Sequence, residues 1–63
     1  MINDIEVGSW IFANAIFGER AYKVLSIKHN NHGALVGTSY GTATFSLCLG
    51  GDNWRFATMD DIA

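Results

Sequence analysis

Proline is absent from this 63-residue sequence, cysteine occurs once, at Cys48, and only 16% of the residues are charged. A single thiol excludes an intrachain disulfide and favours a reducing compartment over a secreted, disulfide-stabilised scaffold. The sequence does not open with a basic segment and an apolar run, so no signal peptide is expected. No apolar run approaches the length of a bilayer span. These absences and the short length predict a cytoplasmic protein that forms one small domain over residues 1–63.

Positive charge is also scarce and scattered. Six acidic and four basic residues give a net charge of −2. The four cations are spread along the sequence at Arg20, Lys23, Lys28 and Arg55. The sequence therefore lacks the basic cluster typical of nucleic-acid-binding proteins, unless folding gathers these side chains on one face.

Apolar residues, in contrast, make up 49% of the chain, more than a domain of this size can bury completely. We therefore expect some of the eight aromatic side chains at the surface. An exposed aromatic patch favours self-association or a protein partner.

The most regular pattern is the stretch from Ala34 to Gly51, in which apolar and polar residues alternate with a period of two. In its second half, one apolar series is predicted to face the core and the residues between to face solvent. That apolar series consists of Ala43, Phe45, Leu47 and Leu49. Glycine inside a strand pattern marks a bulge, bend or tight turn, so Gly37 and Gly41 predict that this ribbon curls.

Three further strands are predicted, over residues 9–13, 21–28 and 54–57. In the first, Trp10 and Phe12 face one way and Ile11 the other, so either both faces are partly covered or one shows an aromatic to its surroundings. In the second, a bulge near residues 25–26 is needed to bring Ile27 onto the face of Tyr22 and Val24.

Loops and turns separate these strands. Residues 14–20 are predicted to form a loop with Ile16 and Phe17 near its tip, folded over one mouth of a barrel rather than held out to a partner. Residues 29–33 and 50–53 carry turn signals. Thr58 followed three residues later by Asp61 is typical of a helix start, so residues 59–62 predict one helical turn with Ile62 tucked into the core.

Five short strands, hairpin turns, a longer first loop and a terminal helical turn resemble the SH3-like small barrels, the broad group that includes KOW and Tudor-type modules. Residues 7–11 (VGSWI) have the glycine, polar, aromatic and apolar order often found where such domains begin, and residues 22–27 (YKVLSI) stand as their second strand. The resemblance implies an all-β, five-stranded SH3-like barrel with a short C-terminal helical turn. The alternative fold is an antiparallel meander of the same strands that dimerises to cover its open face.

No catalytic or metal site is predicted. Cys48 lies in an apolar strand with no base near it in sequence, whereas a reactive thiolate needs an electropositive, accessible setting. Asp60 and Asp61 begin a helical turn, where acids complement the helix dipole. Two turn histidines, His29 and His32, fall short of the four ligands of structural zinc. We therefore expect a protein that is not an enzyme and has no cofactor.

Aromatic surface is the remaining functional signal. In SH3-like barrels, the loops between strands one and two and between strands four and five often flank the ligand groove, and the resemblance places Phe17 and Trp54 there. Trp54 is expected to be partly exposed at a loop–strand junction, because it directly follows a turn. The alternative is that its face, shared with Phe56, points into the core and Arg55 points outward. The predicted partner-binding residues are Phe17, Tyr40, Trp54 and Arg55.

The leading hypothesis is a module that binds another protein through exposed aromatics or a strand edge. A homodimer is compatible with it, and no membrane contact is expected. One alternative is a nucleic-acid-binding domain with its cations on one face and an aromatic for base stacking. Another is an inhibitor of a host factor of the kind encoded by phages and mobile elements, such as the anti-defence, anti-CRISPR type.

Overall fold

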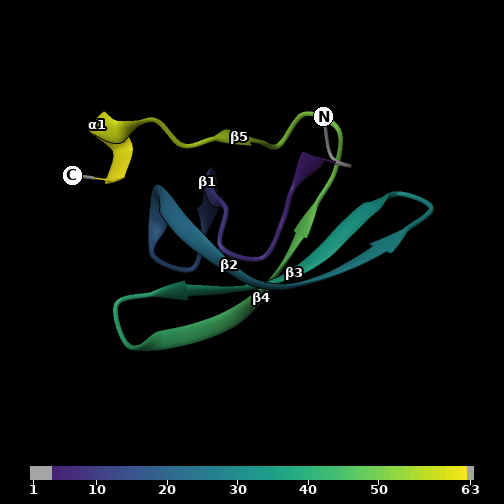
Figure 1. Ribbon diagram of the computed structural model, residues 1–63, viewed down its shortest axis with the longest axis horizontal. Helices are drawn as coiled ribbons and strands as arrows, with labels where there is room; N and C mark the ends of the chain where they lie inside the picture. Colours follow the sequence, from purple (N-terminus) through teal and green to yellow (C-terminus); the bar gives the residue numbers. More distant parts are fainter. Residues whose placement is uncertain (1–3, 63) are drawn as a thin grey trace.

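The computed structural model describes residues 4–62, which form a five-stranded antiparallel sheet followed by one short helix (Figure 1). The strands are β1 (Trp10–Ala15), β2 (Gly18–Asn30), β3 (Gly33–Tyr40), β4 (Ala43–Leu49) and β5 (Trp54–Phe56), and the helix is α1 (Met59–Ile62). Their order in the sheet is β4-β3-β2-β1-β5. Within residues 4–62 the edge strands β4 and β5 do not pair, so the sheet is open. The all-β prediction with a terminal helical turn is confirmed, whereas closure into an SH3-like barrel is not.

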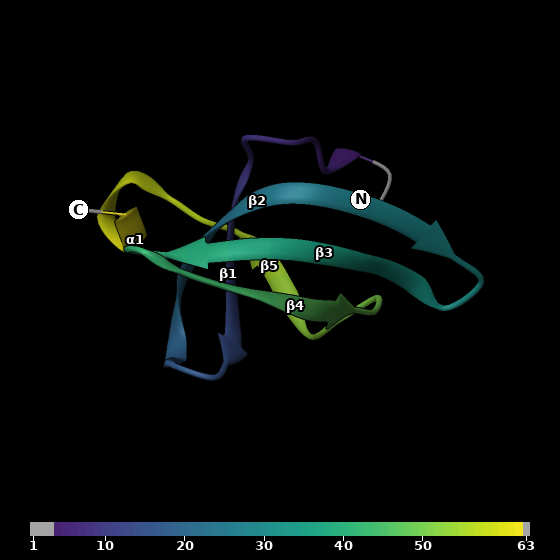
Figure 2. The same ribbon diagram turned by 90° about the horizontal axis from the view of Figure 1, so that it is seen from below.

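The long strand β2 organises the sheet because it pairs with different neighbours along its length. Lys23 faces Trp10 of β1 on one side and Ser39 of β3 on the other. The register with β3 shifts between Val24 and Ser26, which confirms the predicted bulge. Figure 2 shows the result: the hairpin of β1 with the start of β2 lies crosswise to the β3–β4 ribbon, so the sheet curls around its core.

The core lies inside this curl. Its largest fully buried side chains include Tyr22, Ile11, Val24 and Val36. The hydroxyl of Tyr22 donates a hydrogen bond to the Gly18 carbonyl oxygen at 2.6 Å, so its polar atom is satisfied. The core is completed by Ile5, Ala13, Ala34, Leu49 and Trp54. In β4 the inward and outward faces are those that the alternation predicts, with Thr44, Ser46 and Cys48 exposed.

The predicted loop over residues 14–20 is wrong. β1 continues to Ala15 and β2 already begins at Gly18, which leaves Ile16 and Phe17 as a two-residue turn. Gly18 has a φ of 91°, a conformation that glycine adopts without steric cost and that permits this tight connection. The Phe17 ring packs against Tyr40, but Ile16 is 72% exposed, so the expectation that both residues fold over the core is not met at Ile16.

The C-terminal turn is held by its own side chains. The Asp61 carboxylate accepts hydrogen bonds from the backbone N–H of Thr58 at 2.7 Å and from its hydroxyl at 3.0 Å. The predicted pairing of Thr58 with Asp61 is confirmed, but the Thr58 hydroxyl donates to the carboxylate, whereas a capping hydroxyl is expected to accept from a backbone N–H. The expectation that Ile62 enters the core is wrong: its side chain is exposed and borders a groove, because α1 lies beside the face of β2 turned away from the core.

Candidate partner-binding groove

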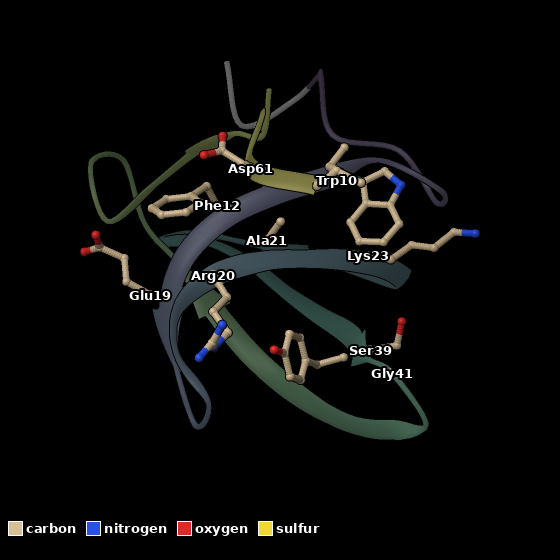
Figure 3. A pocket seen from close by; sticks show the side chains of 11 residues that line it. Trp10, Phe12, Glu19, Arg20, Ala21, Lys23, Ser39, Gly41 and Asp61 are labelled. Carbon is tan, nitrogen blue, oxygen red and sulfur yellow. The ribbon is translucent and has the colours of Figure 1, made fainter. Parts of the chain in front are cut away.

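A groove of about 550 Å³ lies over the outer face of β1 and β2 (Figure 3). Cross-strand pairing builds it: Trp10 is opposite Lys23, and Phe12 is opposite Ala21. These four side chains share one face, because alternate residues of a strand point the same way. Ala21, the smallest of them, lies centrally among the larger side chains in Figure 3. The methyl group of Ala21 is therefore the floor of the groove, and larger aromatic and charged side chains surround it.

The aromatic wall follows from the pattern of β1. Ile11 and Ala13 point into the core, so Trp10 and Phe12 must point outward. Trp10 is 38% exposed, and Phe12 is half-buried. Of the two interpretations that the sequence left open for this strand, the one with an aromatic turned to the surroundings is confirmed.

Three of the chain's four cations lie around this groove, although they are scattered in sequence. Arg20 and Lys23 line it, and Arg55 lies over the ring of Phe12 with its guanidinium 4.2 Å from the ring centre. Arg20 is fixed by a hydrogen bond from its Nε to the Phe17 carbonyl oxygen at 2.9 Å and lies 5.5 Å from the centre of the Tyr40 ring. Folding has thus gathered these cations beside aromatic rings, together with the carboxylates of Glu19 and Asp61, which also line the groove.

An ion pair closes one end of the groove. The Arg55 guanidinium donates two hydrogen bonds to the Asp61 carboxylate, Nη1 to Oδ2 at 2.7 Å and Nη2 to Oδ1 at 3.2 Å. The hydrogen bonds from Arg55 and from the Thr58 N–H hold the pKa of Asp61 well below its usual range. The same contact raises the pKa of Arg55. The Arg55–Asp61 pair is therefore close to neutral, and Lys23 lines the groove apart from it.

The predicted binding residues separate into two groups. Phe17 and Tyr40 are 40% and 37% exposed, and their rings stack with centres 5.0 Å apart, so the structure brings these two together. Tyr40 also lines the groove. Arg55 is exposed but lies across the groove, over Phe12.

The prediction that Trp54 is partly exposed is wrong. Trp54 is only 6% exposed, and its indole Nε1 donates to the Gly50 carbonyl oxygen at 2.9 Å. The cause is the register of β5 on β1, which sets Trp54 opposite the inward-facing Ala13 and Arg55 opposite the outward-facing Phe12.

Of the residues that line the groove, the predicted binding set contained Tyr40 but not Trp10, Phe12, Ala21 or Lys23, although Lys23 belongs to the cations of the nucleic-acid alternative. The alternation of β1 already indicated that the two aromatics share a face. What the sequence lacked was the β1–β2 register, which brings the small Ala21 and the cationic Lys23 beneath and beside them.

The candidates for chemistry remain dispersed in the part of the chain that the structure describes. Cys48 is a free, exposed thiol on the outer face of β4. His29 and His32 line a separate hollow with the Gly50–Gly51 turn. No group of three histidine, cysteine, aspartate or glutamate side chains suited to a metal ion occurs among residues 4–62. Among the same residues, no helix has the length and apolar character needed to cross a membrane.

Comparison of the chain with protein-family models, with curated proteins and with solved structures found no match. The groove therefore has to be interpreted from its own geometry.

Proposed function

We propose that the protein is a non-enzymatic binding module whose groove holds a segment of another protein, with an apolar side chain on Ala21 and carboxylates toward Lys23 and Arg20. The observation that carries the proposal is that aromatic rings and cations meet around one depression in a chain of net charge −2. Two carboxylates also line it: Asp61 is paired with Arg55, and Glu19 lies beside Arg20, which leaves Lys23 as the main attraction for an acidic ligand. Tryptophan, tyrosine and arginine are the residues that most often anchor protein interfaces. A resemblance to SH3-like barrels supports it too, because the β1–β2 turn contributes Phe17 beside the groove.

Nucleic-acid binding is the second candidate, favoured by the same gathering of cations. Base stacking needs open aromatic faces. The Phe12 ring already carries the Arg55 guanidinium, and the Tyr40 ring contacts both Phe17 and Arg20. Trp10 is then the groove ring left for a base, which favours a protein segment over a single strand that stacks on successive ring faces. Inhibition of a host factor is a third hypothesis that would use the same groove.

A selection from a random-peptide display library tests the proposal. We expect enriched peptides to combine one large apolar side chain with neighbouring acidic residues, and a synthetic peptide of that sequence to bind in a fluorescence anisotropy titration. Trp10→Ala should weaken binding by about 2 kcal/mol, as for a hot-spot anchor. Ala21→Leu should weaken it by filling the floor of the groove.

Charge reversal supplies the matched control. Lys23→Glu should weaken peptide binding, whereas Lys28→Glu, the same change farther along β2 and outside the groove, should not. An affinity for the peptide that stays the same in Trp10→Ala and in Ala21→Leu would contradict the proposal. Binding of a labelled oligothymidine that falls steeply with salt and is lost in Lys23→Glu would favour the nucleic-acid alternative instead.

A further inference from the structure

Strand β4 is an edge of the sheet that lacks the usual protection against pairing with another strand. No strand formed by residues 4–62 pairs with its outer side, yet its seven residues keep a continuous register with β3. Exposed edges are normally protected by charged residues, proline, bulges or short length. β4 contains no charged residue and no proline, whereas the other edge, β5, has three residues and carries Arg55.

The backbone groups that β4 offers can be identified from its pairing with β3. Tyr40 and Ala43 close a two-residue turn, and the carbonyl oxygen of Phe45 accepts a hydrogen bond at 3.0 Å from the hydroxyl of Thr38 on β3. Alternate residues of an antiparallel strand direct their N–H and C=O groups to opposite sides. The outward groups therefore belong to Thr44, Ser46 and Cys48.

A side-chain contact confirms this parity. The Cys48 carbonyl oxygen accepts a hydrogen bond from Asn53 Nδ2 at 3.1 Å, so it points away from β3. A carbonyl oxygen has two lone pairs, so it can accept a second hydrogen bond. The edge available to a new strand thus runs from Thr44 to Cys48.

We propose that β4 pairs antiparallel with β4 of a second copy of this chain, about a two-fold axis at Ser46. In this register Ser46 faces Ser46 of the other copy, and Thr44 faces Cys48 in both directions. The three residues whose backbone N–H and C=O groups point away from β3 then lie opposite residues of the same set in the other copy, as a symmetric interface requires. The two sheets join into one.

Self-complementarity on the inner face is what selects a second copy over a foreign strand. The same register sets Phe45 opposite Leu47 of the other copy, and both side chains are half-buried at the margin of the core. Cross-strand aromatic and aliphatic pairs stabilise a sheet. On the outer face only small side chains meet, and no charge of one edge opposes a like charge of the other.

Charge substitution at the axis tests the pairing by sedimentation velocity under reducing conditions. A single strand pair lies at the small end of protein interfaces, so the wild type is measured up to about 1 mM. We expect a monomer–dimer equilibrium whose dissociation constant rises at least about tenfold in Ser46→Lys and in Ser46→Glu, because like charges directly opposite each other destabilise a sheet. Mixing the two variants should restore the dimer, which also shows that both remain folded.

Thr42→Lys is the matched control, since it adds the same charge in the turn beyond the pairing register and should leave dimerisation unchanged. Thr44→Cys gives an independent readout: on oxidation it should form a covalent dimer with Cys48 of the other copy, because directly paired residues lie within disulfide distance. A wild type that remains monomeric at every concentration overturns the proposal. So does a dimer that Ser46→Lys leaves intact, because the interface then lies elsewhere.

Discussion

Removal of the Trp54 side chain should unfold this protein, whereas the other tryptophan, Trp10, should be dispensable for folding. Trp54 is 6% exposed, its ring meets Phe56 edge-on with centres 5.0 Å apart, and its Nε1 is bonded to the Gly50 carbonyl oxygen. Trp10 lies on the opposite face of the sheet and is 38% exposed. The two indoles thus provide a comparison within one chain.

The expected magnitude follows from burial. Truncating a buried tryptophan to alanine costs about 3–5 kcal/mol, and a core in a domain of this size supplies about 3–5 kcal/mol in total. Trp54→Ala should therefore be largely unfolded at 25 °C. Trp54→Phe keeps most of the ring but removes the donor to Gly50, which costs about 1 kcal/mol because that carbonyl is only partly shielded from water.

Urea unfolding followed by far-UV circular dichroism measures the free energy of unfolding of the wild type and of each tryptophan variant. Iodide quenching reports the accessibility of the indole. Trp10→Phe should stay within about 0.5 kcal/mol of the wild type. In that variant the remaining indole should resist iodide, whereas in Trp54→Phe it should be quenched. A Trp54→Ala protein with the wild-type urea midpoint would refute the assignment of Trp54 to the core.

Two further perturbations test the turn after β2 and the C-terminal ion pair. Gly33 has a φ of 146°, and a Cβ there would collide with the backbone carbonyl of Leu49, so Gly33→Ala should cost at least about 2 kcal/mol in urea unfolding, while the control Gly51→Ala, in open space, should cost less than about 0.5 kcal/mol. The lowered pKa of Asp61 means that its contacts stabilise the fold above about pH 4, the ordinary value for aspartate, and are lost as the pH falls from there. Asp61→Asn should therefore lower the melting temperature at pH 7 more than the charge-loss control Asp60→Asn, and should converge with the wild type in acid; equal melting of both variants at pH 7 would contradict the role of the ion pair.

The strands and their faces were predictable where local pattern decides them. The alternation in β4 is a property of consecutive residues, and so is the need for a bulge beside Ser26, because Tyr22, Val24 and Ile27 reach one face in no other way. The prediction of a loop over residues 14–20 was wrong for a local reason as well. In the sequence, Gly18 looks like a break in the strand pattern, whereas its positive φ is what allows a turn of only two residues.

The groove was not predictable because it depends on contacts between distant segments. Whether Trp54 points inward is decided by the register of β5 on β1, some 40 residues earlier in the chain. The same register carries Arg55 onto Phe12 and brings Asp61 to the end of the groove. Residues 50–57 alone do not determine this register. The turn before Trp54 indicated an exposed side chain, but the pairing of β5 with β1 buries it.

The distribution of the large aromatic side chains between the inner and outer faces of the sheet supports the proposed binding role more strongly than any single contact. Tyr22 and Trp54 are both buried on the inner face, each with its polar atom bonded to a backbone carbonyl. The inward positions beside them are small, as at Ala13 and Ala34. Trp10 is left partly in water, although exposed apolar surface forgoes about 25 cal/mol for each Å² not buried. A surface that combines this exposure with cations and a shallow floor at Ala21 is suited to a partner that completes the burial.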